Sequence, residues 1–174
     1  MPSGATHDRI TLISLPIVTG LTLFASQSAS ITLSLAGSFL FSGLMFGPDL
    51  DIYSVQFKRW GMLRWIWRPY QKSMRHRSWL SHGPIIGTLL RLAYLGCWVA
   101  LGTAIWNWVV MVNHGSFLTW HSMQTQIKSF ALQYFWQGMA ILAGLELGAL
   151  SHSWSDAIGS TWKKWRKPRR KGRP

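Results

Sequence analysis

The chain has 174 residues, of which 48% are hydrophobic and 14% aromatic, and its net charge is +13. This hydrophobic content excludes wholesale disorder, and the single cysteine, Cys97, excludes both an intrachain disulfide and a cysteine-based zinc site. The Lys and Arg residues fall in blocks separated by long stretches with almost no charge, a pattern typical of a membrane protein with basic flanks.

Four hydrophobic stretches follow one another along the chain, at residues 10–28, 31–46, 84–112 and 130–150. A membrane-spanning segment needs roughly 20 apolar residues, and helix is its expected state because the backbone must satisfy its own hydrogen bonds. The sequence therefore predicts an all-α membrane helical bundle with about four transmembrane helices. The first stretch could instead be a signal peptide, but only Arg9 precedes it, which is a weak basic flank.

The distribution of Lys and Arg predicts the orientation of these spans. Basic residues concentrate in the loop 56–77 and the tail 163–174, and four spans place both on the same side as the N-terminus. We therefore expect an inner-membrane protein with both termini in the cytoplasm. Residues 1–162 are predicted to form a single helical membrane domain, and residues 163–174 a disordered basic tail.

The basic loop and the tail are expected to contact the lipid bilayer and its anionic headgroups. Tryptophan is favoured at the membrane–water interface, and Trp60, Trp65, Trp67 and Trp79 flank the loop. The tail could alternatively be a nucleic-acid arm. Next to four spans we favour the lipid anchor over nucleic acid as its partner.

Histidine and aspartate residues occur in four short clusters, at 6–8, 48–51, 76–82 and 152–156. The predicted topology brings all four clusters to the cytoplasmic side, and His152 and Asp156 are four residues apart, on one face of a helix. Imidazole and carboxylate groups are typical metal ligands. Each residue taken singly could instead be a helix cap, part of an ion pair or a surface group. As a set they exceed one zinc site and indicate two metals bridged by a carboxylate, with the candidate ligands His7, Asp49, Asp51, His76, His82, His152 and Asp156.

Two ionisable residues, Arg91 and Glu146, lie inside predicted spans, where they are functional candidates by default. They could form an intramembrane ion pair, which would lessen the cost of burying either. Alternatively, Glu146 could be a metal ligand or support one. The sequence leaves both interpretations open.

At these clusters the chain closely resembles a family of small bacterial membrane proteins described as metal-binding proteins of unknown function. The resemblance rests on Thr-His-Asp-Arg at 6–9, Gly-Pro-Asp-Leu-Asp at 47–51, His-Arg-Ser-Trp-Leu-Ser-His at 76–82 and His-Ser-Trp-Ser-Asp at 152–156. More distantly it is similar to membrane-bound metal-dependent hydrolases and the zinc-dependent phospholipase C superfamily. The resemblance implies ligand roles for the seven candidates, although His76 and His82 stand one residue further apart than in the distant hydrolases.

The resulting hypothesis is a metal-dependent hydrolase of phosphoesters that uses two divalent ions. Zinc is favoured, with manganese or iron as alternatives. Arg75 and Arg77 are candidate catalytic residues that stabilise a phosphate oxyanion, and Asp8 is a candidate proton shuttle. The alternative is a non-catalytic protein in which the metals have a structural, sensing or delivery role.

Overall fold

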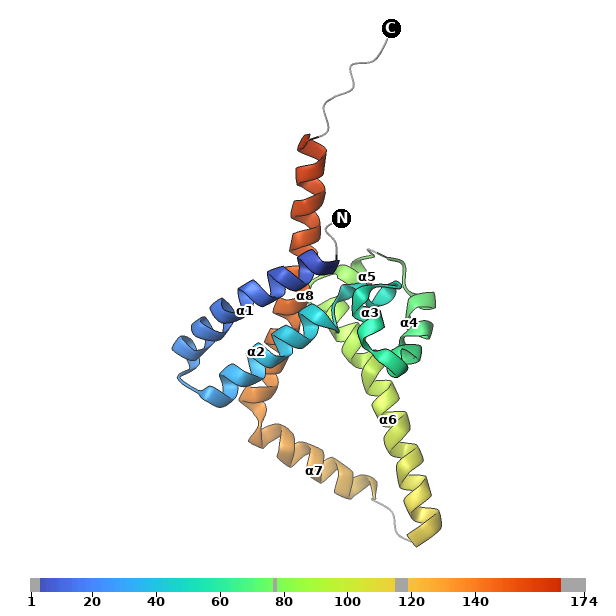
Figure 1. The fold of residues 1–174 in the computed structure, drawn as a ribbon. Coiled ribbons are helices and arrows are strands. Elements are labelled where there is room, and N and C mark those ends of the chain that lie inside the picture. The colour runs from blue at the N-terminus through green and yellow to red at the C-terminus, as the bar shows by residue number, and fades with distance from the viewer. Residues whose placement is uncertain (1–3, 77, 115–118, 167–174) are drawn as a thin grey trace.

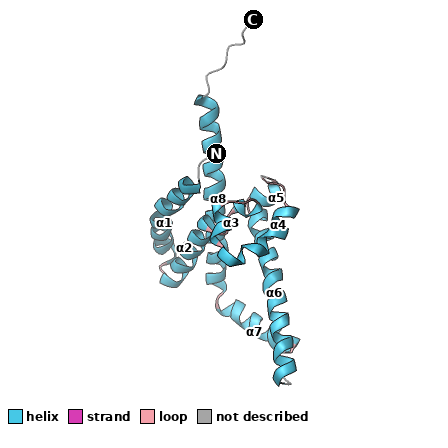
Figure 2. Ribbon diagram, turned by 45° about the vertical axis from the view of Figure 1, so that its right-hand side comes forward, coloured by secondary structure: helices cyan, strands magenta, loops and turns pink. Residues whose placement is uncertain are grey.

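The computed structural model describes residues 4–76, 78–114 and 119–166, and all regular structure in these ranges is helical (Figure 2). The predicted all-α class is therefore confirmed. Figure 1 shows the arrangement of the elements. The elements are α1 (Gly4–Ser26), α2 (Ala29–Leu44), η1 (Pro48–Asp51), α3 (Val55–Arg59), η2 (Gly61–Trp67), α4 (Arg68–Ser73), α5 (Trp79–His82), α6 (Ile86–His114), α7 (Trp120–Gln133) and α8 (Phe135–Arg166).

Two of these helices, α1 and residues 86–113 of α6, are long and apolar enough to cross a membrane. Helices also cover the other two predicted spans, but α2 has only 16 residues. At 1.5 Å per residue it is about 24 Å long, short of a hydrocarbon core of about 30 Å. The second half of α8 is polar. Length and composition thus support two spans where the sequence analysis predicted four.

Close packing of α2 on α8 forms the centre of the fold. Gly148 on α8 faces the α2 backbone, and a Cβ there would lie 2.6 Å from the carbonyl oxygen of Phe39. Gly144, one turn earlier, likewise meets the carbonyl of Leu35. Only glycine allows this approach, and small residues at this spacing are typical of close helix packing. Ser42 adds a hydrogen bond to the carbonyl of Leu145 at 2.6 Å.

The elements predicted to share one side lie at one end of the molecule. The start of α1, the segment from η1 to α5 and the middle of α8 meet there, and α8 then continues beyond them, whereas the α1–α2 turn and α7 lie towards the other end (Figure 1). The assignment of this end to the cytoplasmic side of a membrane stays a prediction.

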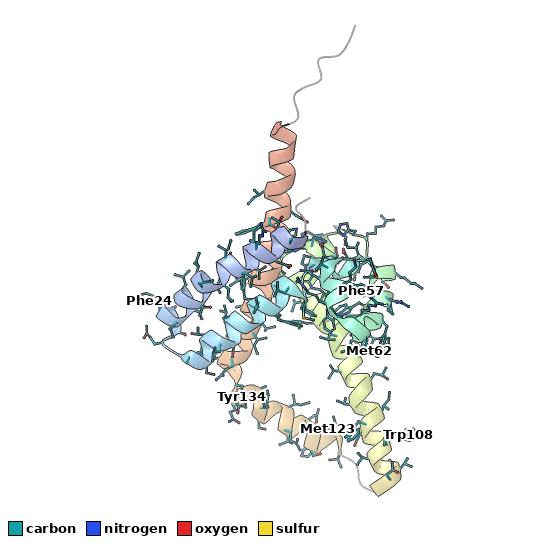
Figure 3. The ribbon with its side chains drawn as sticks, in the orientation of Figure 1. Phe24, Phe57, Met62, Trp108, Met123 and Tyr134 are labelled. Carbon is teal, nitrogen blue, oxygen red and sulfur yellow. The ribbon has the colours of Figure 1, made fainter. Side chains whose placement is uncertain are left out.

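The segment from η1 to α4 has an inner apolar face, which forms a compact core with Leu145 of α8. Trp67 is fully buried in this core, so its predicted place at the membrane interface is wrong. Met62 and Trp65, in contrast, are 93% and 51% exposed, on the outer face of the same segment (Met62 is labelled in Figure 3). The core members are Phe46, Leu50, Phe57, Ile66, Trp67, Tyr70 and Leu145.

Candidate metal centre

The short 3₁₀ helix η1 presents two aspartates to the centre of the polar end. Its apolar residues, Pro48 and Leu50, are buried, and Leu50 belongs to the core. This anchoring fixes the turn, so Asp49 and Asp51 are held beside it with side chains that are 17% and 0% exposed. The backbone forms a 3₁₀ turn here.

Helices α1 and α8 supply the first group of candidate ligands. His152 and Asp156 lie one turn apart on α8 and face His7 of α1. The imidazoles of His7 and His152 stack with centroids 3.9 Å apart, and His7 Nε2 lies 3.4 Å from Asp156 Oδ1. His152 Nε2 in turn lies 3.2 Å from Asp49 Oδ2, which joins this group to η1.

The second group lies on the other side of Asp49. His82 Nε2 of α5 is 3.6 Å from Asp49 Oδ1, the oxygen that faces away from His152. Asp51 contacts both histidines of this group, with Oδ1 3.0 Å from His76 Nδ1 and Oδ2 3.7 Å from His82 Nδ1. All seven residues predicted from the sequence therefore meet in one cluster, and Asp49 directs one oxygen to each half of it.

The nitrogen and oxygen atoms of this cluster are of the kinds that bind divalent metal ions. Several are buried without any hydrogen-bond partner, although the large majority of buried polar atoms in proteins have one. Metal bonds of roughly 2.0–2.2 Å in a tetrahedral zinc site separate two ligand atoms by about 3.3–3.6 Å. The gaps of 3.2, 3.4 and 3.6 Å described above match that spacing. The unpartnered atoms are Asp49 Oδ1, Asp51 Oδ2, His82 Nε2, His152 Nδ1, His152 Nε2 and Asp156 Oδ1.

Asp49 is poised to carry negative charge between the two groups. Burial would raise the pKa of its carboxyl, but the imidazoles of His152 and His82 lie close to its oxygens and outweigh burial. They hold the pKa of Asp49 well below its usual range. An ionised carboxylate with one oxygen on each side is the chemistry that a bridge between two metals requires.

Ser155 is a site residue that the sequence analysis missed. Its hydroxyl donates to the carbonyl of His152 at 2.8 Å and lies 2.6 Å from His7 Nδ1. With the hydroxyl proton on the carbonyl, we infer that the oxygen accepts from His7 Nδ1–H. This tautomer leaves the lone pair of His7 on Nε2, the atom that faces Asp156. The His-x-x-Ser spacing is the only signal in the sequence.

Ser81 and Arg91 support His82 in a similar way. Ser81 is fully buried, and its hydroxyl oxygen lies 2.9 Å from His82 Nδ1. Arg91, 1% exposed, donates to the carbonyl of Ser81 at 3.0 Å and to Thr88 Oγ1 at 3.0 Å. The buried guanidinium therefore fixes the short helix α5, which carries His82.

Arg91 and Glu146 do not form the direct ion pair that the sequence left open. Glu146 Oε1 instead accepts the backbone N–H of Ile85 at 2.8 Å, just before α6. Ile85 has a φ of 63°, a strained conformation for a β-branched residue, and the carboxylate satisfies its N–H. Glu146 lies outside both groups of candidate ligands.

Among the candidate catalytic residues, Asp8 and Arg75 occupy different places relative to the pocket beside the candidate ligands. Asp8 lines the pocket beside the first group, but both its oxygens accept from Arg59, at 2.9 and 2.6 Å. The side chain of Arg75 is exposed and does not line that pocket, and Arg77 lies outside the described residues. Lys58 does line it, which the sequence analysis missed.

Comparisons with known proteins identify the family. The model of a family described as "Uncharacterized metal-binding protein" matches residues 2–166, and the chain belongs to that family. An uncharacterized protein of Aquifex aeolicus (strain VF5) is 38% identical over 58 residues, which cover 33% of this chain and 40% of that protein. The match thus spans less than half of that relative. No solved structure matches the chain. The metal-binding prediction is confirmed at the level of the family, and the likeness to hydrolases stays a prediction.

Proposed function

We propose that this metal-binding protein is membrane-embedded, holds two divalent ions between its clustered histidines and aspartates, and hydrolyses phosphoesters. The observation that carries the proposal is the set of buried, unpartnered donor atoms spaced as two ligands of one ion are spaced. Four imidazoles among seven ligands favour zinc, with manganese or iron as alternatives.

The outward surface of α1 and α6 supports the membrane location. Only 6% of the apolar window of α1 and none of that of α6 is buried inside the protein, although both are strongly hydrophobic. Phe24 near the end of α1 is 80% exposed and Trp106 on α6 is 70% exposed (Phe24 is labelled in Figure 3). A soluble monomer rarely exposes such continuous apolar surface. The inner membrane, both termini in the cytoplasm and contact with anionic headgroups are part of this proposal.

The role of α1 argues against its removal as a signal peptide. His7 and Thr11 of this helix are buried, and His7 belongs to the first ligand group. Cleavage after the helix would therefore remove a ligand.

The chain's own residues define what chemistry the centre can support. When bound, a divalent ion supplies a Lewis acid and lowers the pKa of a coordinated water towards neutrality. Asp49 would hold both ions at a fixed separation, and Ser155 and Ser81 would keep His7 and His82 oriented. Asp8 lies in the same pocket, and a proton-transfer role for it would require its pair with Arg59 to open.

Metal content is the first experimental test. We expect about two ions per chain in detergent-purified protein, and lower content in His82→Ala and Asp156→Ala. His121→Ala is the matched control, because His121 is exposed on α7, outside the cluster. Metal-free native protein, even after incubation with zinc and manganese, would contradict the proposal.

Hydrolysis is tested separately, with a panel of phosphate mono- and diesters, including phospholipids. We expect turnover by native protein and by His121→Ala, and none by Asp49→Asn. Turnover at the full rate in His82→Ala would exclude the proposed centre as its source.

A non-catalytic role is the second candidate, and one observation favours it. The centre joins α1, η1, α5 and α8, which are distant in the sequence, so bound metal would hold the polar end together. Stability that depends on metal, with no turnover of any ester in the panel, would support this role.

A further inference from the structure

A pocket of about 270 Å³ opens beside the first ligand group. One side of it carries candidate ligands, and the other side is formed by the segment 52–58 that follows η1. Its volume lies below the 300–1,000 Å³ typical of sites for drug-sized ligands. The pocket therefore suits a small group, or one end of a larger molecule. The ligand residues in its lining are His7, Asp49, His152 and Asp156.

One cation in this lining has no acidic partner. The neighbouring Arg59 is held by Asp8 in a two-bond ion pair, so these two charges cancel. Lys58 forms no ion pair within the described part of the chain, and its Nζ lies over the ring of Tyr53, 4.9 Å from the centroid. Tyr53 lines the same pocket. Lys58 is thus a positive group available to a ligand at the mouth of the centre.

The charge balance of the centre depends on how many ions it holds. The seven candidate ligands include three carboxylates, from Asp49, Asp51 and Asp156, and four imidazoles that must be neutral to bind metal. One divalent ion leaves the cluster with a net negative charge. Two divalent ions leave it with a net positive charge, so the cluster attracts an anion only in its two-metal form.

We infer that this pocket binds the phosphate group of a phosphomonoester or phosphodiester, contacted by Lys58, and only when both ions are present. The inference rests on the proposed two-metal centre and names the part of the substrate that the pocket recognises. Charge-assisted contacts from a lysine are a common way to bind phosphate. This role for Lys58 is of the same kind as the one predicted from the sequence for Arg75 and Arg77, which stays a prediction.

The test uses the full-length protein in detergent, loaded with zinc and freed of excess metal. Binding of inorganic phosphate is measured by titration calorimetry at constant ionic strength, with metal content determined on the same sample. We expect Lys58→Gln to weaken phosphate binding about tenfold, and Lys58→Arg to retain most of it. Lys72→Gln is the matched control, because Lys72 is exposed on α4 and does not line the pocket. Protein loaded with one ion per chain should bind phosphate at least tenfold more weakly.

Each of the other outcomes overturns a defined part of the inference or of the proposed function. Equal phosphate binding by native protein and Lys58→Gln removes Lys58 from the site, and equal weakening by Lys72→Gln shows a general charge effect. Absence of phosphate binding in protein that holds two ions overturns the inference and leaves the metal centre standing. Protein that takes up no metal overturns the proposed function and the inference together.

Discussion

Replacing Ser155 by alanine should weaken the binding of one metal ion while leaving the other in place. Ser155 touches His7 of the first group and makes no contact with the second group. Without the hydroxyl, His7 Nδ1 loses its acceptor, and the imidazole is free to take the tautomer that places its proton on Nε2. That tautomer cannot bind the ion through Nε2.

The size of the effect follows from the geometry. Loss of a group that orients a metal-bound histidine typically costs 10- to 100-fold in affinity, or about 1.4–2.7 kcal/mol. Ser155 is 8% exposed, and its 2.6 Å contact is short for a hydroxyl–imidazole bond, so we expect the upper part of that range. Stability without metal should fall by about 1–3 kcal/mol, because the hydroxyl makes two hydrogen bonds that usually contribute about 0.5–1.5 kcal/mol each.

Competition with a zinc chelator in detergent measures this loss, one ion at a time. Ser151→Ala is the control, since Ser151 lies one turn earlier on α8 and its hydroxyl donates only to the carbonyl of Gly148, at 2.9 Å. We expect Ser155→Ala to release one ion at low chelator concentration and Ser151→Ala to behave like native protein. Identical release curves for the two variants would refute the assignment of the His7 tautomer.

Three further predictions follow from the same structure. Chelation should lower the unfolding temperature, because metal at 100 times its dissociation constant adds about 2.7 kcal/mol of stability. An unchanged melting curve would show that metal binding does not stabilise the fold. Gly148→Ala should destabilise the α2–α8 contact by about 1–3 kcal/mol in denaturant titration, whereas Gly138→Ala, with open space around it, should be neutral or stabilising. Cys97, exposed in the middle of α6, should resist a water-soluble maleimide in lipid nanodiscs and react once the protein is denatured; rapid labelling of the native protein would place α6 outside the bilayer.

The clustering of the candidate ligands could be predicted from the sequence because its constraints are local and few residues satisfy them. His152 and Asp156 are four apart on a helix, so their common direction follows from helix geometry alone. Asp49 and Asp51 flank a leucine after Gly-Pro, and burial of that leucine leaves both acids on the polar side. The chain has only five acidic residues, and three of them, Asp49, Asp51 and Asp156, belong to the cluster.

The supporting residues could not be predicted, because their roles depend on tertiary contacts. Serine is common in this chain, and the His-x-x-Ser spacing is too weak a signal to single out Ser155, which contacts His7 across 148 positions. The predicted interfacial position of Trp67 was wrong for a related reason. An aromatic residue in a basic amphipathic loop suits either the interface or a core, and only the fold of η1 to α4 decides that Trp67 points inward.

The location of the centre also bears on how the helices hold together. In a bilayer the hydrophobic effect does not drive helices against each other, because lipid tails are as apolar as leucine. The fold has other sources of cohesion: close glycine packing and the hydrogen bond from Ser42 at its centre, and the candidate ligand cluster at its polar end. Towards the opposite end, α6 and α7 expose large side chains such as Trp108 and Ile127 (Trp108 is labelled in Figure 3). Removing metal should therefore loosen α1 and α5 from α8 first, and amide exchange should rise near His7 and His82 before it rises along α2.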